Sequence, residues 1–129
     1  MPNSGIEGNK LKRLDYRLNS WDVDFHAYIT QLQENHSKPI VIAGDLNVVH
    51  QEIDIRWPKA HHKKAGFTKK ERHSFDTFLK ASNIVDSFRH MHPDSVKYSY
   101  FSARGKWRET NDGLRADYFL VSIEMMDDL

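Results

Sequence analysis

Residues 38–68 limit most strongly what the chain can fold into. They join the pattern of a buried strand to two polar side chains at the end of that strand. Residues 40–43 are the apolar run Ile-Val-Ile-Ala. Such a run, rich in β-branched residues, is typical of a strand that is buried on both faces. Gly44 breaks the run, and Asp45 and Asn47 follow it. Since side chains alternate along an extended chain, Asp45 and Asn47 are predicted to project to the same side.

Asp45 and Asn47 form a chemically useful pair for a site at the end of a strand, which is where open α/β sheets bind ligands. Asp45 can coordinate a hard cation or take a proton from water. Asn47 can donate a hydrogen bond to a developing oxyanion without adding charge. A plain turn is the alternative interpretation, because turns favour Asp and Asn. The spacing alone leaves both interpretations open.

Composition limits the classes of protein that the chain can represent. Its 129 residues, 39% of them hydrophobic, predict one domain with a modest core. No apolar run approaches the roughly 20 residues of a membrane span, and the first ten residues lack the apolar core of a signal peptide. The absence of cysteine excludes disulfides and zinc–thiolate sites. These features fit a reducing compartment and no membrane partner.

Charge is distributed unevenly along the chain, although the net charge is only +1. Residues 56–73 contain seven lysines and arginines against one acid, Glu71, and three histidines. Such a segment can neutralise phosphates. A solvated basic loop without a partner is the alternative.

Two helices are predicted from periodicity and capping. Residues 15–33 form an amphipathic pattern, and residues 68–71 read T-x-x-E, a capping box that starts a second helix over residues 69–81. The expected apolar faces consist of Trp21, Phe25, Tyr28, Ile29 and Leu32 in the first helix and Phe75, Phe78 and Leu79 in the second.

Further strands are predicted near the C-terminal end of the sequence. Residues 98–102 alternate aromatic and small polar side chains over most of their length, and residues 116–122 contain an apolar run after Asp117. Between the helices and these strands, Asp86 and Arg89 are spaced to form a supporting ion pair.

A series of motifs resembles one enzyme family. GDLN, EIDI, PK, AGFT and ER follow one another within residues 44–72, with PNSG before them and VDSFR and RADYFLVS after them. In this order they resemble the exonuclease III type of apurinic/apyrimidinic endonuclease. The resemblance implies an α/β fold, the DNase I-like two-sheet α/β sandwich, of which residues 1–129 represent the middle and later part. The N-terminal part with the metal-binding glutamate and the C-terminal part with an Asp-His pair are expected to be missing from this incomplete domain.

The resemblance also implies an activity, which is Mg²⁺-dependent hydrolysis of DNA 5′ to an abasic site, with Mn²⁺ as an alternative metal, and removal of 3′ blocking groups. Asp45 would activate or position water, Asn47 would stabilise the pentacovalent phosphate, and Asp117 would orient a catalytic histidine. Asp45 and Asn47 would form part of the metal site. The 129 residues alone are expected to be weakly active or inactive.

Residues implied to bind DNA lie in several segments: Asn3, His61, Lys64, Arg104 and Leu114. The chain departs from the family pattern at some of these positions. Trp57, His61 and Lys64 replace asparagines, whereas Phe101 and Leu114 replace tryptophans. Trp107 lies in a basic loop, where stacking on DNA and partial burial are both reasonable roles.

Other interpretations remain open at this stage. A phosphoinositide or sphingomyelin phosphodiesterase of the same superfamily would share the GDLN-like motif, and a non-catalytic DNA-binding fragment would share the basic segment. The preferred partner is double-stranded DNA with abasic sites or blocked 3′ ends, and a second chain or segment could complete the fold. The expected location is intracellular, in the nucleus of a eukaryote or the cytoplasm of a bacterium.

Overall fold

The computed structural model describes residues 1–5 and 10–129 of the chain. Its elements occur in an order that alternates helices with three strands. These elements are α1 (Leu14–Tyr16), η2 (Arg17–Trp21), α2 (Asp22–Asn35), β1 (Val41–Asp45), η3 (Glu52–Asp54), α3 (Pro58–His61), α4 (Lys69–Ala81), β2 (Ile84–Asp86), α5 (Ser87–Met91), β3 (Asp117–Ser122) and η4 (Ile123–Asp128). Within the described ranges, none of the helices is long and apolar enough to cross a membrane.

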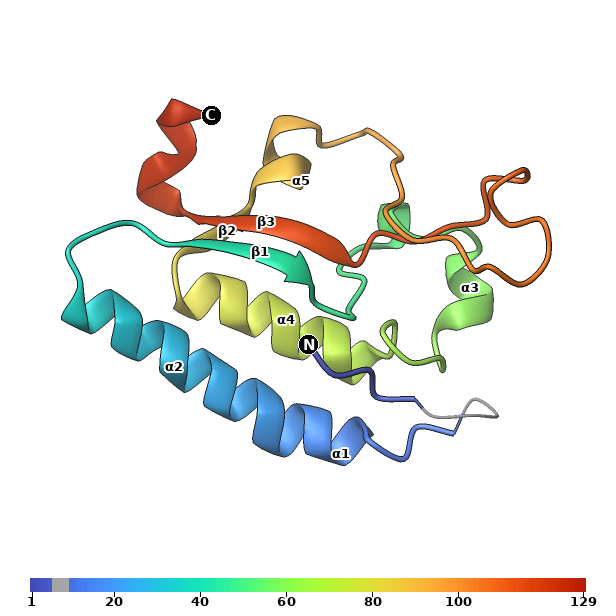
Figure 1. Cartoon of the computed structure of the whole chain (residues 1–129), viewed down its shortest axis with the longest axis horizontal. Coiled ribbons are helices and arrows are strands. Elements are labelled where there is room, and N and C mark those ends of the chain that lie inside the picture. The colour runs from blue at the N-terminus through green and yellow to red at the C-terminus, as the bar shows by residue number, and fades with distance from the viewer. Residues whose placement is uncertain (6–9) are drawn as a thin grey trace.

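The three strands form one antiparallel sheet in the order β1-β3-β2. Helices α2 and α4 lie along one face of this sheet, while α5 and η4 lie on the other side near one end (Figure 1). Helices and sheet therefore form the predicted α/β arrangement. Residues 1–5 and 10–129 form this one three-stranded sheet and not the second sheet of the expected sandwich.

The prediction that residues 40–43 are buried on both faces is wrong for this chain. The strand extends to Asp45, and Val41 is 51% exposed. On the neighbouring strand β3, Phe119 is 66% exposed while Leu120 is fully buried. The physical reason is that β1 lies at an edge of the sheet and that α2 and α4 cover only one face.

The main core lies between the sheet and helices α2 and α4. Phe25 contacts Phe78 with ring centroids 5.4 Å apart, and Ile29 is buried beside them. Tyr28 was expected on the same face but is 56% exposed, so that part of the helical prediction is wrong. The buried cluster comprises Ile29, Leu46, Val48, Phe75, Phe78, Leu79, Ile84, Tyr118 and Leu120.

The capping box at residues 68–71 forms as predicted and starts α4. The Thr68 hydroxyl accepts a hydrogen bond from the Glu71 backbone N–H, and the Glu71 carboxylate accepts one from the Thr68 backbone N–H. Glu71 is only 2% exposed and also accepts hydrogen bonds from the Ser4 hydroxyl and the Gly66 backbone N–H. This single carboxylate therefore attaches the N-terminal turn to the start of α4.

Residues 98–102 do not form the predicted strand. Tyr100 pairs with Leu114 only as an isolated bridge, and the surrounding residues lie in a long loop. Tyr98 and Phe101 instead pack edge to face, with ring centroids 6.2 Å apart. A Cβ at Gly113 would lie 2.7 Å from the Phe101 ring, so the aromatic side chains fold around a glycine rather than alternate along a strand.

Candidate active site

Asp45 and Asp117 lie opposite each other at one end of the sheet. Asp45 ends β1, Asp117 begins β3, and the two residues are direct partners in the antiparallel register. Both residues are exposed. Two like charges in paired positions destabilise a sheet, and a cation between them removes that cost.

Asn47 joins this pair through a turn rather than through strand alternation. The chain leaves the strand after Asp45, and Asn47 adopts a left-handed backbone conformation with φ of 47°. The Asp45 Oδ1 atom accepts a hydrogen bond of 2.8 Å from the Asn47 backbone N–H. Asparagine tolerates this conformation better than most residues. The two side chains therefore meet at one site, although the expected geometry of an extended chain is wrong.

A hollow of about 440 Å³ brings the catalytic candidates together. Asp45, Asn47 and Asp117 line it, and so do two of the expected DNA-binding residues, Asn3 and Leu114. These five residues come from three separate segments of the sequence and share one cavity. The remaining lining residues are Val49, Ala65, Gly66, Ser99, Tyr100 and Ala116.

Asn3 is held beside Asn47 by its own turn. Its Nδ2 atom lies 3.4 Å from the Asn47 Oδ1 atom, and its Oδ1 atom accepts a hydrogen bond from the Gly5 backbone N–H at 2.7 Å. The neighbouring Ser4 is fully buried and donates to Glu71. The turn at residues 2–5 therefore has a fixed position at the rim of the hollow.

Arg17 stabilises the site from the buried side. No pattern in the sequence indicated this role. It is 2% exposed, and its Nη2 atom donates to the Leu46 carbonyl at 2.8 Å. Its Nη1 atom donates to the Pro2 carbonyl at 2.7 Å, and its Nε atom donates to Asp22 at 2.8 Å. The π-helical segment η2 starts at Arg17, so residues five apart lie on one side and Asp22 comes within reach. One guanidinium thus holds both the turn of Asn47 and the turn of Asn3.

Ser99 positions the start of β3. Its hydroxyl accepts hydrogen bonds from the backbone N–H groups of Ala116 at 3.1 Å and Asp117 at 3.2 Å. The alternating sequence around Ser99 suggested a strand, so this role was missed. A hydroxyl that binds two backbone donors is the feature that fixes Asp117 at the rim of the hollow.

Four buried charged side chains hold the segment before Asp117 in position. Arg115 donates to Asp54 at 2.9 Å and to Asp86 at 2.6 Å, while Arg89 donates to Asp54. The expected side-chain ion pair between Asp86 and Arg89 does not form, because each side chain instead pairs with a residue from another segment. From Arg89, the Asp86 carboxylate accepts the backbone N–H, as the cap of α5.

The buried charges are balanced within this network. Burial by itself would raise the pKa of Asp54, which is fully buried, but hydrogen bonds from Arg115 and Arg89 and their positive charges hold that pKa below its ordinary value. Burial would lower the pKa of Arg115, yet its bonds to Asp86 and Asp54 raise it. Asp54 and Arg115 therefore remain charged, and the network acts as a rigid link between η3, α5 and β3.

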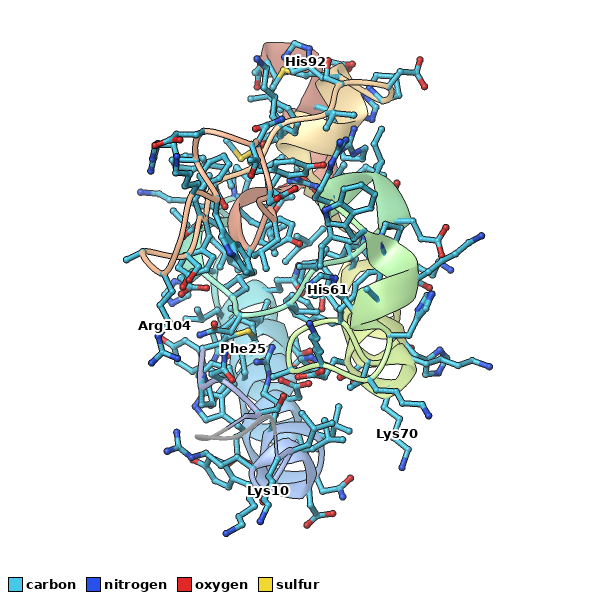
Figure 2. All side chains as sticks on the ribbon, turned by 90° about the vertical axis from the view of Figure 1, so that its right-hand side faces the viewer. Lys10, Phe25, His61, Lys70, His92 and Arg104 are labelled. Atoms are coloured by element: carbon cyan, nitrogen blue, oxygen red, sulfur yellow. The ribbon has the colours of Figure 1, made fainter. Side chains whose placement is uncertain are left out.

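The five residues expected to bind DNA share a second hollow. It measures about 530 Å³, adjoins the first at Asn3 and Leu114, and is also lined by His61, Lys64 and Arg104. His61 belongs to α3 and Arg104 to the loop before β3, and Figure 2 shows both at the end of the molecule that faces the viewer. Lysines 59, 63, 64, 69 and 70 are exposed. Lys64 and Arg104 of the second hollow therefore adjoin the acidic end of the sheet.

The donor atoms at the first hollow suit a hard cation in part. Carboxylate and amide oxygens from Asp45, Asp117 and Asn47 are ligands that Mg²⁺ accepts, and Mg²⁺ often uses only one or two carboxylates together with water and phosphate. In the part of the chain that the structure describes, no group of three or more His, Cys, Asp or Glu side chains could hold a metal. The described residues therefore fit Mg²⁺ as a partial site.

Comparison with known proteins gives the same family as the motifs. A sequence model of the Endonuclease/Exonuclease/phosphatase family matches residues 9–124. The chain belongs to this family. It is 49% identical over 130 residues to a DNA-(apurinic or apyrimidinic site) endonuclease of Dictyostelium discoideum, and 45% identical over 120 residues to an exodeoxyribonuclease of Bacillus subtilis. These matches cover 100% and 92% of the chain but 35% and 46% of the two relatives.

Solved structures of the family share the fold. An AP endonuclease from Leishmania major superposes with a TM-score of 0.88 and 33% identity, covering 98% of this chain and 40% of that one. The 3′ phosphatase NExo from Neisseria, bound to a product DNA hairpin, gives a TM-score of 0.82 at 27% identity, covering 89% of this chain and 44% of that one. The DNase I-like α/β fold implied by the resemblance is therefore confirmed. The present chain spans less than half the length of each of these relatives.

Proposed function

We propose that the protein acts in DNA repair as a phosphodiesterase of the abasic-site endonuclease and 3′–5′ exonuclease type. The observation that carries this proposal is the shared hollow of Asp45, Asn47 and Asp117, which adjoins the hollow of His61, Lys64 and Arg104. The first set can act on a phosphate, and the second can hold the charged backbone on either side of it. The named relatives are an abasic-site endonuclease and an exodeoxyribonuclease, which supports DNA as the substrate.

Each residue of the first hollow has a distinct chemical role in this proposal. Asp45 accepts a proton from the attacking water or holds that water in place, because its carboxylate is exposed at the end of β1. Asn47 donates from its amide to the negative charge that develops on the phosphate. Asp117 would accept a hydrogen bond from the catalytic histidine that the family resemblance implies, and so fix the tautomer of its imidazole. Asp45 and Asn47 would hold part of the coordination shell of Mg²⁺, or Mn²⁺ in its place, which lowers the pKa of water and neutralises phosphate charge.

Leu114 provides an apolar wall for a deoxyribose that has lost its base. It packs against the small buried cluster of Val49, Ile55 and Phe67, and it exchanges two backbone hydrogen bonds with Tyr100. An apolar wall favours a bare sugar over a polar base edge. This position supports abasic DNA or a blocked 3′ end as the substrate.

Incision of a duplex that contains one tetrahydrofuran nucleotide tests the proposal. The 129-residue chain is assayed with Mg²⁺, and so is a chimera in which these residues replace the matching segment of the Bacillus subtilis relative. We expect weak or no incision by the chain alone and clear incision by the chimera, which Asp45→Asn and Asp117→Asn abolish. Asp94→Asn, an exposed acid in the loop after α5, serves as the matched control and should leave the rate unchanged. A folded chimera without incision would contradict the proposal.

DNA binding without catalysis is the second candidate, because the exposed lysines of residues 56–73 suit it. It predicts salt-dependent duplex binding by the chain that Asp45→Ala leaves unchanged, together with an inactive chimera. The incision assay therefore separates the two candidates.

A further inference from the structure

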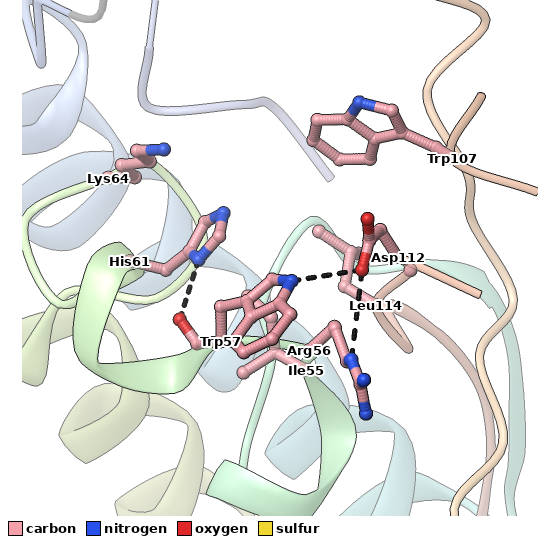
Figure 3. Close-up of a pocket in the computed structure, with 9 residues that line it drawn as sticks. Ile55, Arg56, Trp57, His61, Lys64, Trp107, Asp112 and Leu114 are labelled. Carbon is pink, nitrogen blue, oxygen red and sulfur yellow. Dashed lines mark hydrogen bonds and ion pairs between the residues drawn. The ribbon is translucent and has the colours of Figure 1, made fainter. Parts of the chain in front are cut away.

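A third, smaller cavity adjoins the hollow of the catalytic candidates at Leu114. It measures about 190 Å³, and two tryptophans, Trp57 and Trp107, line it together with His61, Lys64 and Asp112 (Figure 3). It shares Leu114 with the hollow of Asp45, so the two cavities are neighbours. Its volume is below the roughly 300 Å³ at which pockets for drug-sized ligands begin, so it suits a single planar ring system.

Trp57 has a backbone conformation that a tryptophan rarely adopts. Its φ is 58° and its ψ is 54°, in the left-handed region, and the next residue is Pro58. A bulky side chain in this region costs on the order of 1–3 kcal/mol, and a following proline disfavours helical conformations further. Burial does not offset this cost, because Trp57 is 58% exposed. Backbone strain at Trp57 that does not contribute to folding points to a functional role for this residue.

Two contacts fix the indole of Trp57 in place, and a third contact involves its backbone carbonyl. Its Nε1–H donates to the Asp112 Oδ1 atom at 2.9 Å, and the Arg56 guanidinium carbon lies 4.7 Å from the ring centroid (Figure 3). The Trp57 carbonyl lies within hydrogen-bond distance of the His61 Nδ1 atom, at 2.9 Å. Arg56 therefore covers one face of the indole, and the Trp57 side chain also lines the cavity. Pre-oriented aromatic rings lose little entropy when a base stacks on them.

Asp112 connects the two tryptophans. Its carboxylate accepts the Trp57 indole N–H, while its backbone N–H donates to the Trp107 carbonyl at 2.8 Å. Trp107 is 36% exposed, so part of this residue is also accessible. The loop that carries Trp107 is thereby attached to the segment that carries Trp57, and both rings belong to one cavity.

We propose that this cavity is a stacking subsite for one nucleobase of the DNA, next to the nucleotide whose phosphate occupies the hollow of Asp45. The proposal rests on the proposed function for the identity of its ligand. Trp57 and Trp107 offer π faces to the base, which any base can use, and Lys64 offers positive charge to its phosphate. The subsite would hold a base that has left the stack beside a damaged position.

A pair of single-stranded hexamers tests this subsite on the 129-residue chain. One hexamer carries thymine at each position, and the other carries tetrahydrofuran nucleotides, so the two differ only in the bases. Trp21→Phe removes the third tryptophan, which stacks on Phe25 in the helix, and the remaining fluorescence reports Trp57 and Trp107. We expect the thymine hexamer to quench this fluorescence and to bind roughly tenfold more tightly than the baseless hexamer.

Substitutions of Trp57 decide whether the preference comes from the cavity. Trp57→Asn removes the ring but suits the left-handed backbone, so the variant should fold at least as well as the parent. It should bind both hexamers equally, at the affinity of the baseless one. Tyr28→Ala, an exposed aromatic residue on α2, is the matched control and should retain the tenfold preference.

Three outcomes would overturn the subsite: equal binding of the two hexamers by the parent chain, an undiminished preference in Trp57→Asn, or no binding of either hexamer. The proposed function fails separately, because incision by the chimera depends on Asp45 and Asp117. A chimera that cuts DNA without a base preference rejects the subsite alone. A base preference in the chain with an inactive chimera rejects only the nuclease activity.

Discussion

Asp45 and Asp117 are direct cross-strand partners at the end of the β1–β3 pair, so that two exposed carboxylates share one position in the ladder. Neither side chain is placed there to stabilise the sheet, since like charges in paired positions repel each other. Proteins retain such a cost mainly where the same groups act on a ligand. The repulsion between the two carboxylates can therefore be tested by measuring the stability of the chain, without an enzyme assay.

Asp117→Asn should stabilise the isolated chain while it abolishes incision by the chimera. Removing one charge from the pair should raise the free energy of unfolding by at most about 0.5 kcal/mol, because both carboxylates are exposed and screened by solvent. Urea denaturation at low ionic strength measures the gain. In an Asp45→Asn background the same substitution should give no gain, and in about 1 M salt the gain should disappear. A loss of stability in low salt would count against the repulsion.

Asp54→Ala should be among the most destabilising single substitutions in the chain. It leaves the guanidinium groups of Arg89 and Arg115 buried without their shared carboxylate, and loss of one partner from a buried pair typically costs about 3–5 kcal/mol. Urea denaturation provides the measurement. Lys80→Met breaks an exposed pair with Asp76 and should cost no more than about 0.5 kcal/mol. Similar losses in the two variants would show that the buried network does not act as a unit.

Arg17→Lys should loosen the turn that carries Asn47 even though the charge is retained. A lysine cannot reproduce the planar fork that reaches the Leu46 carbonyl, the Pro2 carbonyl and Asp22. We expect a loss of about 1–3 kcal/mol in the free energy of unfolding. Amide hydrogen exchange at residues 46 and 47 should accelerate as well. Arg13→Lys, at an exposed arginine one turn earlier, should change both quantities little.

The sequence predicted those parts of the structure that depend on local chemistry or on linked motifs. The Thr68–Glu71 capping box fixes where α4 starts, and the acid–amide pair of Asp45 and Asn47 lies in one hollow. Both signals need only a few neighbouring residues. The placement of Asp117 beside Asp45 could also be expected, but only through the resemblance, because 72 positions separate the two residues.

Features that depend on distant partners could not be predicted. Arg17 binds mainly backbone carbonyls, which leave no side-chain pattern in the sequence. Trp57 reaches Asp112 across 55 positions, and periodicity contains no information at that range. The exposure of Val41 was missed for a related reason, since an apolar run does not reveal what covers each face of its strand.

His50 should make the stability of the chain depend on pH just below neutrality. Burial lowers its pKa below the ordinary value of 6.5, and the hydrogen bond and charge of Asp76 only partly offset this effect. Its ring packs edge-on against Phe75, with ring centroids 5.2 Å apart. Below pH 6.5 the unfolded chain therefore binds a proton that the folded chain does not. The free energy of unfolding should fall as the pH falls from about 6.5 toward the lowered pKa.

Replacing His50 isolates its part of this pH dependence. His50→Gln should flatten the slope of the unfolding free energy between about pH 7 and pH 5. Some slope should remain, because burial also lowers the pKa of His26, which stacks on Phe78. Thr77→Gln, at an exposed residue of α4 that carries no titrating group, should leave the slope as it is in the parent chain. Urea denaturation at a series of pH values gives all three curves. An unchanged slope in His50→Gln would show that the imidazole titrates in the folded chain as it does in the unfolded one.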